Sequence, residues 1–288
     1  MEARTIHEEG ATEGFGPEGA GQSAVSLEEE FAHSERELPA ERRAQLRERL
    51  LAETPGWYSP VAHLMGSTTF GLLFAVVAGF FLDGVRWWDW LAVPASFVIA
   101  NFLEWHAHRD LLHKRQWWLP VLYDRHTPIH HLVFVSHDMA ILERREWRQV
   151  LMPASGVALI VVMLFPICSV IWLVGLPNLA ILAFITNIAY VLSYEWLHLS
   201  YHLPPESWIG RRRVIRFLGR HHAVHHAPSL MRLWNMNVTV PLWDWVRGSI
   251  ADRERAESAL RAPERAPGSS SSSPPRAGGQ GPWRWRRG

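Results

Sequence analysis

The chain has 288 residues, of which 48% are hydrophobic and 20% are charged, and its formal net charge is +1. This balance excludes a highly charged disordered chain and gives no indication of a nucleic-acid partner. With one cysteine, Cys168, the sequence also excludes a disulfide scaffold and a cysteine-rich zinc module.

Residues 1–55 form an acidic leader, with 13 Glu and 6 Arg up to Glu53. Its first part is rich in glycine and predicts disorder. The run AERRAQLRERLLAE after Pro39 predicts one amphipathic helix. We expect the leader as a whole to be a solvated tail.

Residues 54–82 contain no Asp, Glu, Lys or Arg. A bilayer core needs about 20 helical residues, so this stretch predicts one span near 61–82. A tryptophan-rich turn follows at 83–90, and tryptophan suits the membrane interface. Apolar residues then resume and predict a second span that ends near Glu104.

Residues 150–194 form a run of 45 without formal charge. As one helix they would be about 68 Å long, roughly twice the bilayer core, so the chain must turn back. Gly175 to Asn178 is the expected turn, which gives spans at 150–173 and 178–197. We therefore predict an all-α integral membrane protein with four transmembrane helices in two hairpins and a cytoplasmic, histidine-rich helical cap.

The orientation follows from the charges of the connections. Residues 104–149 carry seven Lys and Arg, whereas the outer turns carry only Arg86. The positive-inside rule then places both termini and the middle connection in the cytoplasm. We expect a multi-pass protein of the cytoplasmic membrane, since the arginine-rich, lysine-poor composition suggests a bacterial source.

Thirteen of the 16 histidines lie between positions 106 and 226, mostly in four clusters: HAHRDLLH, HTPIHH, HLSYH and HHAVHH. In the four-span topology all four clusters meet at one membrane face. Neutral imidazole is a good ligand for iron, zinc, copper and nickel, and about ten imidazoles exceed one mononuclear site and suit two metals.

Helical spacing leaves two choices open among these histidines. His108 and His113 are five apart and need a distorted helix or must flank a site from two sides, whereas His106 and His113 share a helical face better. In the fourth cluster His222, His225 and His226 share one helical face, whereas His221 in place of His222 would give an HX3HH spacing.

The ordered spacings HX4H, HX3HH, HX3H and HX2HH resemble those of the fatty acid hydroxylase/sterol desaturase superfamily of integral-membrane di-iron enzymes. The segment from Asn235 through Pro241-Leu242-Trp243-Asp244-Trp245 to Gly248 is similar to the one that follows the last box in that family. The resemblance covers about residues 60–250, and we assign the domain to 56–250. It implies that the following residues bind metal: His108, His113, His126, His130, His131, His198, His202, His222, His225 and His226.

The resemblance further implies two iron ions, O2 as co-substrate, and attack on an unactivated C–H bond of a lipid. We expect a fatty acyl chain, because the segment around HTPIHH looks like that of fatty-acid-hydroxylase-type members. Glu195 and Asn235 are expected to orient ligand histidines by hydrogen bonding. Electrons would come from a separate reductase, ferredoxin or cytochrome, since neither tail resembles a fused cytochrome b5 domain.

Other functions stay open at this point. The same boxes would suit a sterol- or carotenoid-type hydroxylase or desaturase, or a noncatalytic metal-binding membrane protein. Residues 251–288, rich in Pro, Ser, Gly and Arg, are expected to be a disordered tail.

Overall fold

The computed structural model describes residues 37–261. Over these residues the chain is helical and has no β-strand, only one isolated bridge between Val135 and Asp138. The prediction of an all-α protein is therefore confirmed for this range. The disorder expected for the first part of the leader and for the end of the tail falls on residues outside it.

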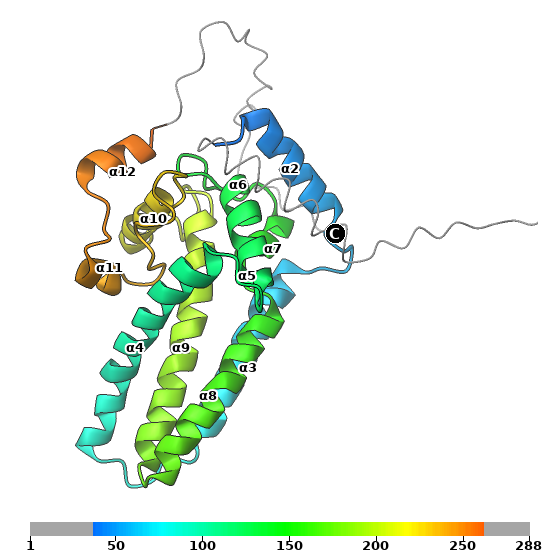
Figure 1. The fold of residues 1–288 in the computed structure, drawn as a ribbon. Coiled ribbons are helices and arrows are strands. Elements are labelled where there is room, and N and C mark those ends of the chain that lie inside the picture. Colours follow the sequence, from blue (N-terminus) through cyan, green and yellow to red (C-terminus); the bar gives the residue numbers. More distant parts are fainter. Residues whose placement is uncertain (1–36, 262–288) are drawn as a thin grey trace, which may run out of the picture.

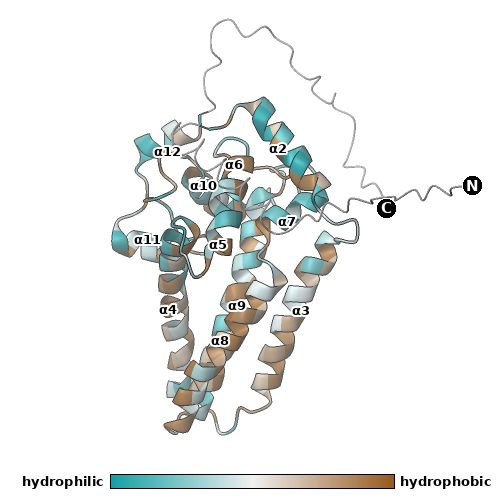
Figure 2. Ribbon diagram, turned by 45° about the vertical axis from the view of Figure 1, so that its right-hand side comes forward, coloured by the Kyte–Doolittle hydropathy of each residue, from teal (hydrophilic) through white to brown (hydrophobic). Residues whose placement is uncertain are grey.

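Four long helices run side by side at one end of the molecule (Figure 1). They are α3 (Pro60–Gly79), α4 (Ala92–Ala107), α8 (Ala154–Leu173) and α9 (Pro177–His202). Helix α9 is the central one, because it contacts each of the other three. Many of their residues are hydrophobic (Figure 2), and large side chains such as Leu73 and Ile167 are exposed. An exposed apolar surface of this extent suits contact with lipid.

Three segments are long and apolar enough to cross a membrane: Pro60–Gly79, Arg144–Leu173 and Pro177–His202. They overlap three of the four expected spans. The remaining expected span corresponds to α4, which has 16 residues and is about 24 Å long. It begins directly after the tryptophan-rich segment, where Trp87–Leu91 form a 3-10 turn, and it ends three residues beyond the expected Glu104.

The connection between α8 and α9 forms where it was predicted. Gly175 has a φ of +88°, a left-handed conformation that glycine adopts without a steric penalty. Pro177 then occupies the first position of α9, where its missing N–H costs no helical hydrogen bond. The two helices pack against each other along their length.

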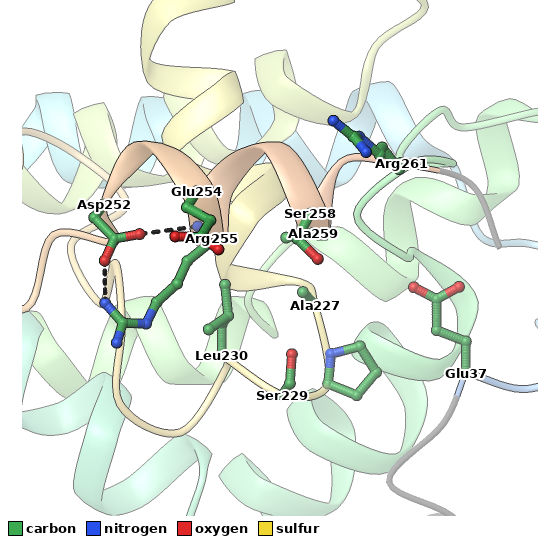
Figure 3. A pocket seen from close by; sticks show the side chains of 11 residues that line it. Glu37, Ala227, Ser229, Leu230, Asp252, Glu254, Arg255, Ser258, Ala259 and Arg261 are labelled. Carbon is green, nitrogen blue, oxygen red and sulfur yellow. Dashed lines mark hydrogen bonds and ion pairs between the residues drawn. The ribbon is translucent and has the colours of Figure 1, made fainter.

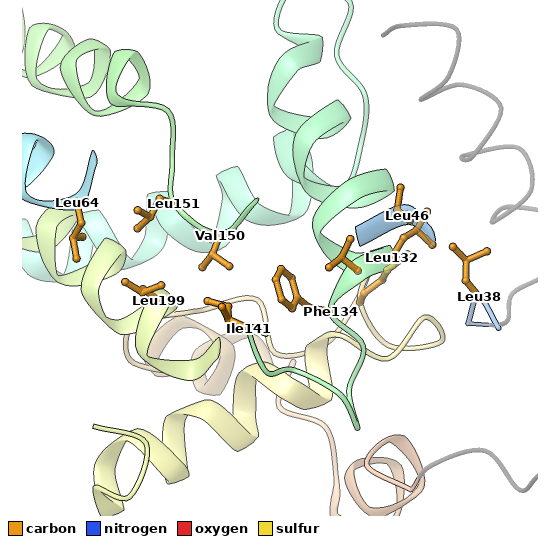
Figure 4. Close-up of a cluster of buried hydrophobic side chains, with 11 residues drawn as sticks. Leu38, Leu46, Leu64, Leu132, Phe134, Ile141, Val150, Leu151 and Leu199 are labelled. Carbon is orange, nitrogen blue, oxygen red and sulfur yellow. The ribbon is translucent and has the colours of Figure 1, made fainter. Parts of the chain in front are cut away.

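The shorter helices gather at the other end of the bundle and form a cap (Figure 1). They are α2 (Ala40–Ala52), α5 (Pro120–Arg125), α6 (His131–Val133), α7 (Trp147–Val150), α10 (Arg213–His225), α11 (Leu242–Arg247) and α12 (Arg253–Ala259), with a 3-10 turn at Arg144–Glu146 and π-helical turns at His108–Leu112 and His126–His130. A buried cluster that includes Leu132, Phe134, Ile141 and Leu199 joins the cap to α9 (Figure 4).

Helix α2 was predicted, but the expectation of a solvated tail is wrong for this part of the leader. Leu46 is buried in the same cluster as Phe134 (Figure 4). Arg47 is also buried, and its guanidinium forms an ion pair with Glu146 at 3.0 Å. Apolar burial and this ion pair therefore hold α2 against the cap.

Part of the segment that was expected to be a disordered tail is helical. Disorder was expected from residue 251, but Arg253–Ala259 form α12. The Asp252 side chain caps this helix by accepting a hydrogen bond from the Arg255 N–H at 2.9 Å. Ala256 and Leu260 pack beside Leu230 in an apolar cluster, which gives the helix a buried face.

Candidate metal centre

The ten histidines expected as ligands converge inside the cap, next to the ends of α4 and α9. They come from the π-helical turn after α4, the π-helical turn before α6, the end of α9 and the end of α10. All ten are buried, with exposed fractions of 0 to 7%: His108, His113, His126, His130, His131, His198, His202, His222, His225 and His226.

The five-residue spacing of the first motif is accommodated by a distorted helix. The His113 N–H donates to the His108 carbonyl at 3.2 Å, which is a π-helical hydrogen bond. The two imidazole rings consequently stack, with centroids 5.1 Å apart. His106 lies outside this arrangement, with its Nδ1 atom 3.5 Å from the Asp110 carboxylate. The structure therefore brings His108, and not His106, to the cluster.

The second motif also contains a π-helical turn, at His126–His130. Pro128 lies within this turn, and proline has no N–H to donate to an α-helical bond. His126 and His130 stack with ring centroids 5.3 Å apart. The turn allows His126 to face a different set of histidines from His130.

Nine of the ten histidines form two groups, and within each group one nitrogen atom per residue lies within 4.8 Å of all the others. The first histidine group comprises His108, His113, His126, His131 and His225. The second histidine group comprises His130, His202, His222 and His226. An ion with nitrogen ligands at about 2.1 Å holds them at most about 4.2 Å apart, so each group has close to the size of a metal site.

The two groups are neighbours. In two pairs of adjacent histidines, one residue belongs to the first group and the other to the second. His130 belongs to the second group and His131 to the first, and His225 and His226 divide in the same way. The rings of His131 and His226 stack with centroids 4.2 Å apart. The arrangement therefore has room for two metal ions side by side.

His198 lies beside the second group, with its Nε2 atom 3.3 Å from that of His130. In the fourth motif His222 lies in the second group and is fully buried. His221 points elsewhere and its Nε2 atom lies 3.0 Å from the Asp244 carboxylate.

The hydrogen bonds of the first group leave bare nitrogen atoms that face one another. His225 Nδ1 donates to the Trp234 carbonyl at 3.0 Å, since a carbonyl oxygen can only accept. His113 Nδ1 donates to the Thr127 hydroxyl, because that hydroxyl gives its own proton to the Leu112 carbonyl. The neutral rings therefore carry lone pairs on two Nε2 atoms that are 3.0 Å apart. Two lone pairs at this distance repel each other, and a cation between them removes the repulsion.

The second group also contains bare nitrogen atoms. His226 Nδ1 donates to the Phe134 carbonyl, so its Nε2 atom is bare and lies 3.0 Å from His222 Nε2. His202 Nδ1 donates to the Met139 carbonyl at 2.9 Å, and His202 Nε2 is buried without a hydrogen-bond partner. Buried, unpartnered acceptors are costly, and a bound metal would satisfy them. The donor set therefore fits a metal ion.

Burial also keeps these rings in the form that binds metal. It lowers the pKa of His108 to about 4 and that of His226 to about 3. Burial together with the neighbouring imidazoles holds the pKa of His113 and His225 well below the ordinary value. The rings are consequently neutral at pH 7, and neutral imidazole is the ligand form.

Asp244, at the start of α11, supports the first group through the backbone. Its fully buried carboxylate accepts hydrogen bonds from the N–H groups of Met236 and Asn237 at 2.9 and 2.8 Å. It also accepts from Trp105 Nε1 at 3.0 Å and from the Ser249 hydroxyl at 2.6 Å. The Met236 carbonyl, fixed in this way, accepts a hydrogen bond from His108. Sequence reasoning did not identify this role, although an acidic residue within the apolar segment after the last box was a signal for it.

Asn235 supports the same segment through hydrogen bonds to backbone groups. Its side chain donates to the His221 carbonyl at 2.9 Å and accepts from the Ala251 N–H at 2.8 Å. These bonds hold its backbone at a φ of +56°, between the Trp234 and Met236 carbonyls that orient two histidines. Asn235 thus acts through the backbone and not by bonding a ligand ring.

Glu195 is buried, and its carboxylate accepts from the Met152 N–H at 3.1 Å. It therefore ties the connection before α8 to α9, whereas sequence reasoning expected it to orient a histidine. Further polar support that sequence reasoning missed lies on α4. Asn101 accepts from the Trp243 N–H at 3.0 Å, and Glu104 accepts from the Thr239 N–H at 3.1 Å.

Two pockets lie away from the histidines. A pocket of 530 Å³ lies between α12 and the Ala227–Leu230 turn (Figure 3). An apolar pocket of 610 Å³ lies between α3, α8 and α9, and Phe74, Phe165 and Trp172 are among the side chains that line it. None of the ten histidines lines either pocket, so neither is the slot that would hold a substrate at the metal centre.

A model of the family described as fatty acid hydroxylase matches residues 93–249, which is more than half of the chain. No curated protein and no solved structure matches the chain. The matched segment contains all ten histidines of the cluster, and also Asn235 and Asp244. The chain therefore belongs to the fatty acid hydroxylase family.

Proposed function

We propose that this protein is an O2-dependent, di-iron membrane oxidoreductase that hydroxylates an unactivated C–H bond of a lipid, with a fatty acyl chain as the substrate. Family membership points to an oxidoreductase of the hydroxylase or desaturase kind. The observation that carries the proposal is the pair of adjacent, buried, all-histidine groups, each of which contains bare imidazole nitrogen atoms.

We assign one iron ion to each group. The first ion would be held by the first histidine group, and the second ion by the second histidine group together with His198. Bound iron would supply the electron transfer to O2 that makes oxidation of a C–H bond accessible. Neutral imidazole ligands add no negative charge, so the irons would stay cationic.

The other role that we assign to the chain is to position the ligand histidines and to shield them from water. Backbone carbonyls fix the tautomer and the direction of several rings, as the Gln149 carbonyl does for His130 at 3.0 Å. Burial keeps bulk water from the centre and keeps the imidazoles neutral. Glu195 and Asn235 would hold the backbone segments around the centre in place.

We further propose that α4 is a fourth membrane span and that the cap lies in the cytoplasm. Helix α4 lies beside α9 in the bundle (Figure 1). Trp87 and Trp90, in the turn that precedes α4, are exposed and suit a membrane interface. The positive charges of the 104–149 connection belong to the cap, which fits a cytoplasmic location.

The electrons would come from a separate reductase, ferredoxin or cytochrome. Hydroxylation by O2 consumes two electrons from outside the substrate, and imidazole ligands do not provide them. The two termini would be cytoplasmic as well, with the catalytic domain at 56–250.

The test is lipid analysis in cells that express the wild-type chain or single variants. We expect lipids with one added oxygen atom in cells with the wild-type chain and their loss with His130→Ala, His202→Ala or His226→Ala. His106→Ala is the matched control, because His106 lies outside both groups, and it should retain activity. Equal oxidation by the three variants and the wild-type chain would refute the proposal.

A further inference from the structure

Helix α2 lies outside the segment that matches the family, yet one of its side chains reaches the shell of the second histidine group. Arg47 is 7% exposed, and its guanidinium forms hydrogen bonds with both carboxylate oxygens of Glu146, at 3.0 and 3.1 Å. The same guanidinium donates to the Val133 and Ala140 carbonyls, each at 3.3 Å. Arg47 therefore connects two points of the connection between α6 and α7.

That connection and α7 together carry the acceptors for three of the four members of the second group. The Phe134 carbonyl accepts from His226 Nδ1, and the Met139 carbonyl accepts from His202 Nδ1 at 2.9 Å. The Gln149 carbonyl, within α7, accepts from His130 Nδ1 at 3.0 Å. The geometry of the second group thus depends on the path of the backbone from Val133 to Gln149.

Arg47 holds this path at the residues beside two of those acceptors. Val133 precedes Phe134, and Ala140 follows Met139. The guanidinium carbon also lies 5.1 Å from the centre of the Phe134 ring. That ring in turn packs against His202, with centroids 4.6 Å apart.

Glu146 completes the arrangement from the opposite side. Its carboxylate accepts from the Leu142 N–H at 2.7 Å, in addition to the bonds from Arg47. Glu146 is 3% exposed, so the ion pair is shielded from water. Removing one partner would leave the other charge buried and unpaired, which is strongly unfavourable.

The first histidine group has a different support. His108 and His225 donate to the Met236 and Trp234 carbonyls, and Asp244 fixes that segment. Each group thus has its own buried ionic support, Asp244 for the first and the Arg47–Glu146 pair for the second.

We propose that Arg47 is a positioning residue for the second metal ion alone. Helix α2, which carries Arg47, then contributes to the geometry of the metal centre. This inference rests on the proposed function, because it assumes that the two groups bind metal. Loss of a hydrogen-bonding partner behind a ligand typically weakens metal binding about 10- to 100-fold. We expect a weakening of this size at the second group in Arg47→Gln, with no change at the first.

The experiment is a Co2+ titration of the metal-free, full-length protein in detergent, followed by visible absorption and by total metal per chain. Arg47→Gln is compared with the wild-type chain and with Arg49→Gln, a control on the same helix whose side chain is exposed and pairs with Glu53. Glu146→Gln perturbs the same ion pair with little change of shape, and it serves if Arg47→Gln does not fold.

Two double variants identify the site that is weakened. In the Arg47→Gln background, His222→Ala should remove no further tight binding, because the second group is already impaired. His113→Ala in the same background should remove the remaining tight site. A chain that still binds one ion tightly is also folded, so this measurement contains its own control for folding.

Two tight ions in both Arg47→Gln and Glu146→Gln would overturn the inference while leaving the proposed function intact. Loss of both ions from a folded Arg47→Gln protein would also overturn it, because the effect would not be confined to one group. A wild-type chain that binds neither ion would instead contradict the proposed function.

Discussion

Replacing Asp244 by Asn perturbs the first histidine group without changing the size of the side chain. The carboxylate is completely buried and accepts hydrogen bonds through both oxygens. With the amide oxygen in place of Oδ1, the amide nitrogen faces the Asn237 N–H, and the charged interaction with His221 is lost. At about 1–3 kcal/mol for each of these two bonds, we expect Asp244→Asn to lower the free energy of unfolding by about 2–6 kcal/mol.

Thermal unfolding in detergent, followed by circular dichroism, measures this effect. For a chain of this size a change of 1 kcal/mol shifts Tm by about 2–4 °C, so the expected decrease is roughly 4–24 °C. Asp252→Asn is the matched control, because Asp252 caps the short helix α12 and its side chain is 55% exposed. Asparagine caps helices about as well as aspartate, so this control should change stability by less than about 0.5 kcal/mol. Equal Tm values for the two variants would refute the assigned role of Asp244.

Three further predictions concern the choice of ligand and the packing around it. His222→Ala should lose one metal ion per chain and His221→Ala should lose none, measured by elemental analysis; the opposite result would reverse the assignment. Gly71→Val should destabilise the bundle by about 1–3 kcal/mol, because even a Cβ atom on Gly71 would lie 3.1 Å from Leu192 side-chain atoms, and an unchanged Tm would contradict the close contact between α3 and α9. Phe134→Ala should cost about 3–5 kcal/mol, since this fully buried ring contacts His202, and a wild-type Tm would contradict its place in the core.

The sequence predicted the parts of this fold that depend on local pattern. Long runs without charge predicted the apolar helices, because a membrane requires length and hydropathy that can be counted along the chain. Histidine spacing and its place relative to those runs predicted that the four clusters meet. Gly175 and Pro177 predicted the turn between α8 and α9, because each residue restricts the backbone locally.

The remaining features depend on partners that are distant in the sequence. His106 and His108 are both plausible on an ideal helix, and only the π-helical turn brings His108 to the centre. Arg47 looked like a charge on a solvated helix, because its partner Glu146 is 99 residues away. Asp244 likewise acts on Trp105 across 139 residues. Buried charges of this kind leave no periodic pattern, so spacing alone did not reveal them.

The assignment of the two histidine groups as iron sites is tested most directly by the metal content of the purified wild-type protein after iron-replete expression, combined with X-ray absorption at the iron edge. The proposed function predicts two iron ions per chain whose scattering is dominated by imidazole nitrogen. Folded protein without tightly bound metal, or with iron that lacks imidazole ligands, would contradict it.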